Sequence, residues 1–138
     1  MLDMLVRNVN LSDGRKGVDI AIKEGKIVEI STGIKGHAIE EVDGRGYLAT
    51  PPFVDSHFHM DSALSLGEPR LNQSGTLLEG IEIWSELKPQ LTVDAIKKRA
   101  LEMCRWAIAR GTLAIRSHVD ISDDRLLAVE ACWKSAGK

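Results

Sequence analysis

The sequence predicts an α/β protein in which a strand-rich segment precedes alternating strands and helices. Residues 1–50 contain short runs of Val and Ile that alternate with polar residues. Residues 51–138 give the order strand, long loop, helix, strand, helix, which is typical of a parallel α/β unit with right-handed crossovers. Pro51 and Pro52 mark the change between the two parts, because proline suits neither a helix interior nor a central strand.

Residues 1–50 have the pattern of small antiparallel strands, and we expect them to form part of a β-sandwich domain. The dipeptides Asp13-Gly14 and Glu24-Gly25 supply the positive backbone angles that tight turns need. The expected strands are Asp3–Val9, Val18–Lys23 and Lys26–Ser31, with a further extended piece from Tyr47 to Ala49.

Residues 51–138 are expected to supply two consecutive strand–helix units. Thr92 is a suitable N-cap for a long helix, and Gly111 is suited to its exit. Ser122 is expected to cap the last helix. The expected elements are a strand at Phe53–His59, a short helix at Ile81–Leu87, a long helix from Thr92 to Arg110, a strand at Thr112–His118 and a helix from Asp123 to about Ala136.

The composition indicates a soluble globular protein of the cytoplasm. The net charge is −2 and Lys and Arg form no run, so neither a nucleic acid nor a membrane surface is an expected partner. No stretch approaches the roughly 18 apolar residues of a membrane span. Cys104 and Cys132 are expected to be buried thiols in a reducing compartment, and not a disulfide framework.

The segment PPFVDSHFHMD, residues 51–61, carries the strongest chemical signal. His57 and His59 are two positions apart, so on a strand their side chains leave the same face. They stand at the C-terminal end of that strand, where α/β barrels keep their chemistry. Two imidazoles on one face can share one cation, although the pair alone is equally compatible with ordinary surface histidines.

The context of the histidine pair resembles the amidohydrolase superfamily, and within it the cytosine-deaminase branch. The resemblance covers essentially the whole chain and rests on three segments. They are PPFVDSHFHMD, LNQSGTLLEGIEIW (residues 71–84) and ARGTLAIRSHVDISD (residues 109–123). The fold it implies is the start of a (β/α)8 metal-dependent hydrolase barrel, preceded by part of a small β-sandwich.

The resemblance implies that one divalent metal ion, Fe²⁺ or Zn²⁺, is held by His57 and His59 at the barrel mouth. In this family the metal activates water for attack on the amidine-like carbon of a heterocycle, so that cytosine becomes uracil and ammonia leaves. Leu77 matches a position that lines the pyrimidine pocket, where a flat ring needs an apolar wall. Relatives that act on isocytosine, creatinine-like rings or N-substituted triazines are the alternatives within the class.

His118 and Asp120 end the second barrel strand and are therefore candidates to orient the metal ligands. A hydrogen-bonded histidine beside a structural carboxylate is an equally good interpretation of the same pair. Asp61 is expected to cap a loop and Trp84 to pack, and neither is assigned to chemistry.

The resemblance places the family's remaining metal ligands, its proton-transferring glutamate and its substrate-holding glutamine in later strands, after Lys138. We therefore expect no catalytic residue within residues 1–138, an incomplete barrel, and no deamination by this segment alone. The expected partners are a small heterocyclic substrate and either a homo-oligomer or the missing remainder of the barrel. The alternative is a truncated homologue without catalytic activity.

Overall fold

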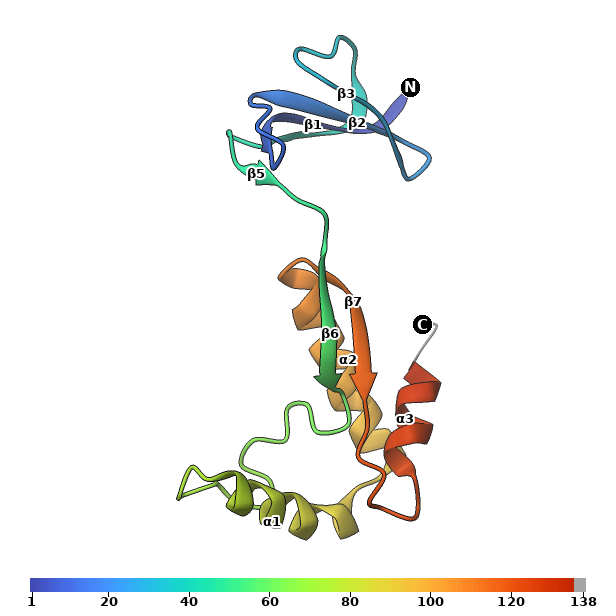
Figure 1. The fold of residues 1–138 in the computed structure, drawn as a ribbon. Coiled ribbons are helices and arrows are strands. Elements are labelled where there is room, and N and C mark those ends of the chain that lie inside the picture. The colour runs from blue at the N-terminus through green and yellow to red at the C-terminus, as the bar shows by residue number, and fades with distance from the viewer. Residues whose placement is uncertain (136–138) are drawn as a thin grey trace. The chain divides into compact units, whose positions relative to one another are not determined.

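The computed structural model describes residues 1–135 and divides into two compact units, Met1–Pro51 and Pro52–Lys138. The first unit is strand-rich and the second mixes strands and helices (Figure 1). This confirms the α/β class, and each unit is described by itself below.

The first unit contains one five-stranded sheet. Its strands run in the order β3-β2-β1-β4, with β5 paired to the far end of β1. The β1–β2 and β2–β3 pairs are antiparallel, whereas β4 and β5 both run parallel to β1. The buried side chains of Leu5, Ala21 and Ile34 form its core. The bounds of the strands are β1 Leu2–Leu11, β2 Val18–Lys23, β3 Lys26–Ser31, β4 Ala38–Asp43 and β5 Leu48–Ala49.

Among the described residues the strands of this unit form one sheet. That this sheet is part of a β-sandwich stays a prediction, whereas the predicted strand directions need correction. The purely antiparallel prediction is wrong because it missed β4, whose sequence AIEEVD lacks alternation and whose residues are mostly exposed. Pairing with β1 makes this segment a strand, and Arg7 on β1 supports it through a 3.1 Å ion pair with Glu41.

The second unit is built on two neighbouring parallel strands, β6 Phe53–His59 and β7 Thr112–His118. Both strands have the predicted bounds, and in Figure 1 the long helix α2 (Val93–Ala109) runs beside them. Parallel strands are normally buried on both faces. Here Phe53, Val54 and Leu113 remain exposed, so this sheet keeps apolar surface that its own unit does not cover.

The helices meet in a second core. Helix α1 (Leu77–Leu87) continues into the 3-10 turn η1 (Lys88–Gln90), and α3 (Leu127–Ser135) packs against α2. Burial of a side chain such as that of Ile96, which is fully enclosed, stabilises the fold by about 1.5–3 kcal/mol. The buried members of this core are Leu87, Leu91, Ile96 and Ala131.

Helix starts were predicted with mixed success. The hydroxyl of Thr92 accepts a hydrogen bond from the Ala95 N–H, which confirms the predicted N-cap of α2. Helix α1 begins four residues before the predicted Ile81, because Thr76 provides the same kind of cap.

The predicted start of the last helix at Asp123 is wrong. Residues 121–126 form a turn in which the Asp123 carboxylate accepts from the Arg125 N–H, and Leu126 has a positive φ of 51°. Ser122 therefore does not cap this helix, which begins at Leu127. Its predicted end at Ala136 lies outside the described residues.

Candidate functional site

Three histidines gather where β6 and β7 end. His59 and His118 are the last pair of the parallel ladder, and their ring centroids are 6.0 Å apart. His57 lies two positions earlier on β6, with its ring stacked on that of His118 at 3.8 Å and 5.7 Å from that of His59. The structure therefore brings both predicted ligands and one of the predicted orienting residues to the same strand ends.

The chemistry of this cluster suits a borderline metal ion such as zinc or iron, which imidazole nitrogens bind readily. His118 Nδ1 is buried and has no hydrogen-bond partner among residues 1–135. This nitrogen is therefore free to contact a bound ligand. In the same described range, no three His, Cys, Asp or Glu side chains are placed to hold a metal ion together. His57 and His59 therefore do not make up a complete coordination sphere among these residues.

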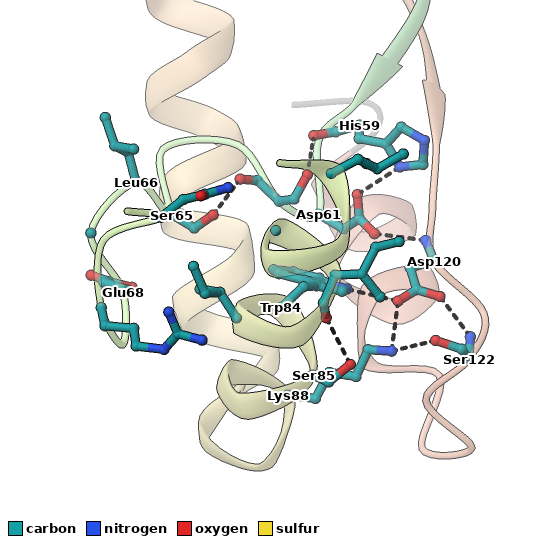
Figure 2. A pocket seen from close by; sticks show the side chains of 18 residues that line it. His59, Asp61, Ser65, Leu66, Glu68, Trp84, Ser85, Lys88, Asp120 and Ser122 are labelled. Carbon is teal, nitrogen blue, oxygen red and sulfur yellow. Dashed lines mark hydrogen bonds and ion pairs between the residues drawn. The ribbon is translucent and has the colours of Figure 1, made fainter. Parts of the chain in front are cut away.

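An open cavity of about 600 Å³ lies beside His59. It is bounded by the loop after β6, by α1 and by the segment after β7 (Figure 2). Leu77 is on its wall with 79% of its surface exposed, while His57 and His118 are not part of the lining. Its volume is within the range of small-molecule sites. The residues that matter most below are His59, Asp61, Leu77, Trp84, Lys88 and Asp120.

Asp61, which was predicted to cap a loop, lies in contact with the histidine cluster. Its side chain is almost completely buried, with 1% exposed, and lies between His59 and the segment after β7. One carboxylate oxygen lies 3.3 Å from His59 Nδ1, and the other accepts a 2.7 Å hydrogen bond from the Asp120 N–H. The carboxylate two residues after His59 was the available signal for this contact, but its burial was not evident from the sequence.

Asp120 is held by donors from three directions, as the alternative of a structural carboxylate expects, whereas the Nδ1 atom of the adjacent His118 lacks the hydrogen bond that this alternative gives it among residues 1–135. Trp84 Nε1 donates to it at 2.7 Å and Lys88 Nζ lies 2.9 Å away, so Trp84 does more than pack. The Ser122 N–H donates to its other oxygen at 2.8 Å. Burial alone would raise the pKa of the Asp120 carboxyl, but these hydrogen bonds outweigh it and hold the pKa well below its usual range.

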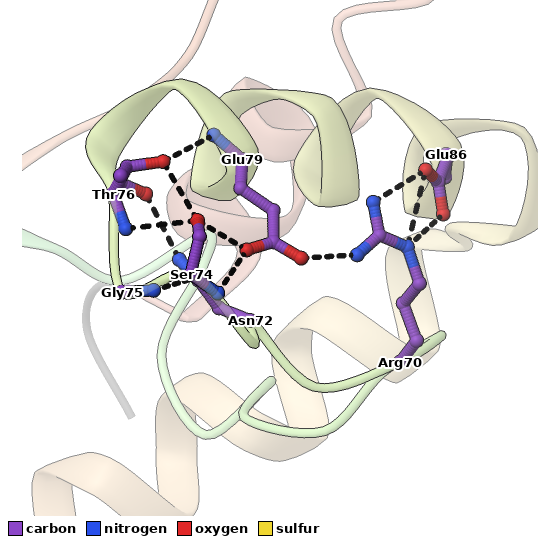
Figure 3. A network of polar contacts seen from close by, with 7 residues as sticks. All are labelled: Arg70, Asn72, Ser74, Gly75, Thr76, Glu79 and Glu86. Atoms are coloured by element: carbon purple, nitrogen blue, oxygen red, sulfur yellow. Dashed lines mark hydrogen bonds and ion pairs between the residues drawn. The ribbon is translucent and has the colours of Figure 1, made fainter.

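A polar network joins the loop before α1 to that helix (Figure 3), and two of its members, Arg70 and Asn72, also line the cavity. The Glu79 carboxylate accepts hydrogen bonds from Ser74 Oγ and Ser74 N–H, at 2.5 and 2.6 Å, and from Arg70 at 2.7 Å. Arg70 also contacts Glu86 on the same helix. The hydrogen bonds from Ser74, followed by those from Gln73 and Arg70, lower the pKa of Glu79 to about 2. These contacts hold the loop before α1 against that helix. The segment LNQSGTLLEGIEIW begins in this loop.

The fold and the two-histidine strand define the class of protein. Residues 40–136 match the sequence model of the amidohydrolase family, and the chain belongs to that family. Among described residues 1–135, no helix is long and apolar enough to cross a membrane.

The chain is similar to an amidohydrolase and to a deaminase of known structure. It is 34% identical over 134 residues to N-isopropylammelide isopropyl amidohydrolase of Pseudomonas sp. strain ADP, a match that covers 94% of this chain and 33% of the relative. The structure of 5-methylcytosine deaminase from Klebsiella pneumoniae with 5-fluorocytosine matches with a TM-score of 0.83 and 34% identity, over 95% of this chain and 32% of that one.

N-isopropylammelide isopropylaminohydrolase from Burkholderia multivorans shares the fold, with a TM-score of 0.74 and 23% identity over 98% of this chain and 34% of that one. The chain thus spans about a third of the length of the relatives that it matches.

Proposed function

We propose that the protein carrying this chain catalyses hydrolytic deamination of a nitrogen heterocycle of the cytosine type. The observation that carries the proposal is the likeness to 5-methylcytosine deaminase, which combines 34% identity with a TM-score of 0.83 over 95% of the chain. In such a reaction water adds to the ring carbon that bears the amino group. The C–N bond breaks, a C=O bond forms, and the amino nitrogen leaves as ammonia.

His57 and His59 are proposed to be two ligands of a divalent Fe²⁺ or Zn²⁺ ion. When bound, such an ion lowers the pKa of a coordinated water to near neutrality and so supplies the nucleophile. Catalytic zinc sites use three protein ligands. At least one further ligand would therefore come from residues other than those described, since His57 and His59 have no third partner among them.

The cavity beside His59 is the proposed place for the ring. Leu77 offers an apolar surface to the ring face, and Lys88 and Asp120 are charged groups on the same lining. A planar heterocycle with polar edges fits a site of this composition, because the apolar wall binds the face and the polar groups fix the orientation.

The exposed apolar side chains of β6 and β7 support a further part of the proposal. Phe53, Val54 and Leu113 are the kind of residues that a parallel sheet buries under neighbouring elements. We propose that additional strands and helices of the same barrel cover them, supplied by further polypeptide or by a second subunit. The metal ligand and the acid–base groups that are not among the described residues would come with those strands.

A second candidate is loss of an alkylamine from a triazine ring. It is favoured by the 34% identity to N-isopropylammelide isopropyl amidohydrolase over 94% of the chain. The chemistry at the ring carbon is the same, and only the leaving amine and the ring differ.

One assay tests both candidates. The metal-loaded protein with a complete barrel is incubated separately with cytosine, 5-methylcytosine and N-isopropylammelide, and the amine released and the mass of the ring product are measured. Ammonia release with replacement of an amino group by oxygen supports the first candidate. Alkylamine release only from the triazine would favour the second, and no product from any of the three would overturn both.

A further inference from the structure

Asp61, in the first turn after β6, is fixed by contacts on several sides. Its side chain contacts His59 Nδ1 and the Asp120 N–H, as described above. Its own carbonyl oxygen accepts a 3.2 Å hydrogen bond from Arg99 Nη2, and Arg99 Nε donates to the Ala63 carbonyl at 3.0 Å. Helix α2 thereby holds the backbone of the turn, while the segment after β7 holds the carboxylate.

Asp120, whose N–H binds the Asp61 carboxylate, is itself held in place by other residues. The Asp120 side chain is held by Trp84 and Lys88, which come from α1 and η1 (Figure 2). Its backbone N–H is consequently presented to Asp61 at a fixed place. If the Asp61 side chain rotated away from His59, the Asp120 N–H would lose its hydrogen-bond partner. Because this N–H is partly buried, that loss costs free energy.

We infer that Asp61 is a positioning residue for His59, which holds the imidazole ring in one orientation and in one tautomer. An ionised carboxylate oxygen only accepts hydrogen bonds, so the hydrogen of the His59–Asp61 contact lies on Nδ1. Nε2 then carries a free lone pair. Only the use of that lone pair as a metal ligand rests on the proposed function, whereas the orientation and tautomer of the ring do not.

Asp61→Asn tests the inference with almost no change in side-chain volume. The amide keeps one acceptor, and the Asp120 N–H requires it. The amide NH₂ then faces His59 Nδ1, which must become the acceptor, so that the ring hydrogen moves to Nε2. A histidine with a proton on Nε2 cannot bind a metal through that atom. The matched control is Asp123→Asn, since the Asp123 side chain contacts Arg125 and no histidine.

The first measurement is ¹⁵N NMR of the histidine rings in the metal-free protein, at a pH where the imidazoles are neutral. The expected result is an Nδ1–H tautomer for His59 in the parent and in Asp123→Asn, and an Nε2–H tautomer in Asp61→Asn. A parent in which His59 carries its hydrogen on Nε2 would overturn the inference, and this result does not depend on the folding of any variant.

The second measurement is a titration of the same proteins with Zn²⁺. The dissociation constant is expected to rise by about 10–100-fold in Asp61→Asn and to stay unchanged in Asp123→Asn. Unchanged zinc affinity together with an unchanged tautomer in Asp61→Asn would overturn the inference. If the tautomer changes as expected but His57→Ala/His59→Ala binds zinc as tightly as the parent, the proposed metal role fails while the positioning of the ring stands.

Discussion

The Asp61 carboxylate accepts a 2.7 Å hydrogen bond from the backbone N–H of Asp120, although 59 positions separate the two residues. The backbone ladder between β6 and β7 ends at the His59–His118 pair, so this bond continues the connection beyond the last rung. It joins the first turn after β6 to the first residues after β7. The segment that carries the histidines is therefore fixed by side-chain contacts as well as by the sheet.

In the protein with a complete barrel, replacing His57 and His59 together by Ala should remove the bound metal and abolish turnover. Both imidazoles leave the same strand end, and without them His118 is the one histidine left of the three that gather there. Metal analysis of the purified protein, with the assay above, checks this. His37→Ala is the control, because that histidine is exposed and lies in the strand-rich unit. Unchanged metal content in the double variant would contradict the assignment.

Leu77→Arg should weaken binding of a neutral heterocycle. The change places a charge on the cavity wall where the ring would displace water from it, and an unpaired charge resists desolvation. We expect KM to rise roughly tenfold, which corresponds to about 1.4 kcal/mol. The neighbouring Leu78 is similarly exposed but does not line the cavity, so Leu78→Arg is the matched control. Equal KM values for both variants would show that Leu77 does not contact substrate.

Glu79→Gln should lower the melting temperature at neutral pH and lose this effect in acid. The folded-state pKa of Glu79 is lowered from 4.5 to about 2, so its stabilising contribution is fully present above about 4.5 and is lost as the pH falls towards 2. Thermal melting of both proteins across this pH range checks the prediction. Glu82→Gln, the same change on the same helix, is the control. A difference from the parent that stays constant down to pH 2 would contradict it.

Asp19→Ala should destabilise the strand-rich unit. The buried Asp19 carboxylate accepts hydrogen bonds from the N–H groups of Asn8 and Ile34 and pairs with Arg7 at 3.1 Å. Its removal takes this acceptor from the Asn8 and Ile34 N–H groups and an ion-pair partner from Arg7, which should lower the free energy of unfolding by roughly 2–4 kcal/mol. Urea unfolding measures this loss. Asp13→Ala removes an exposed carboxylate from a turn and should have little effect, so equal losses in both variants would refute the prediction.

The bounds of four strands, β2, β3, β6 and β7, could be predicted exactly from the sequence, because alternation and turn dipeptides are local signals. Strand β4 could not, since its residues are mostly exposed and its extended form depends on pairing with β1, more than thirty positions away. The early start of α1 was in principle readable from Thr76 and Glu79, which form a capping pair of the usual spacing.

The sequence by itself determined the α/β order of the second unit, the amidohydrolase family, and the placement of His57 and His59 on one face of a strand end. These follow from periodicity and from motifs within a few residues. Only the tertiary structure decided that Asp61 is buried, that Trp84 and Lys88 bind Asp120, and that the rings of His57 and His118 stack. Each of these contacts depends on side-chain directions at the ends of separate elements, and no local pattern encodes them.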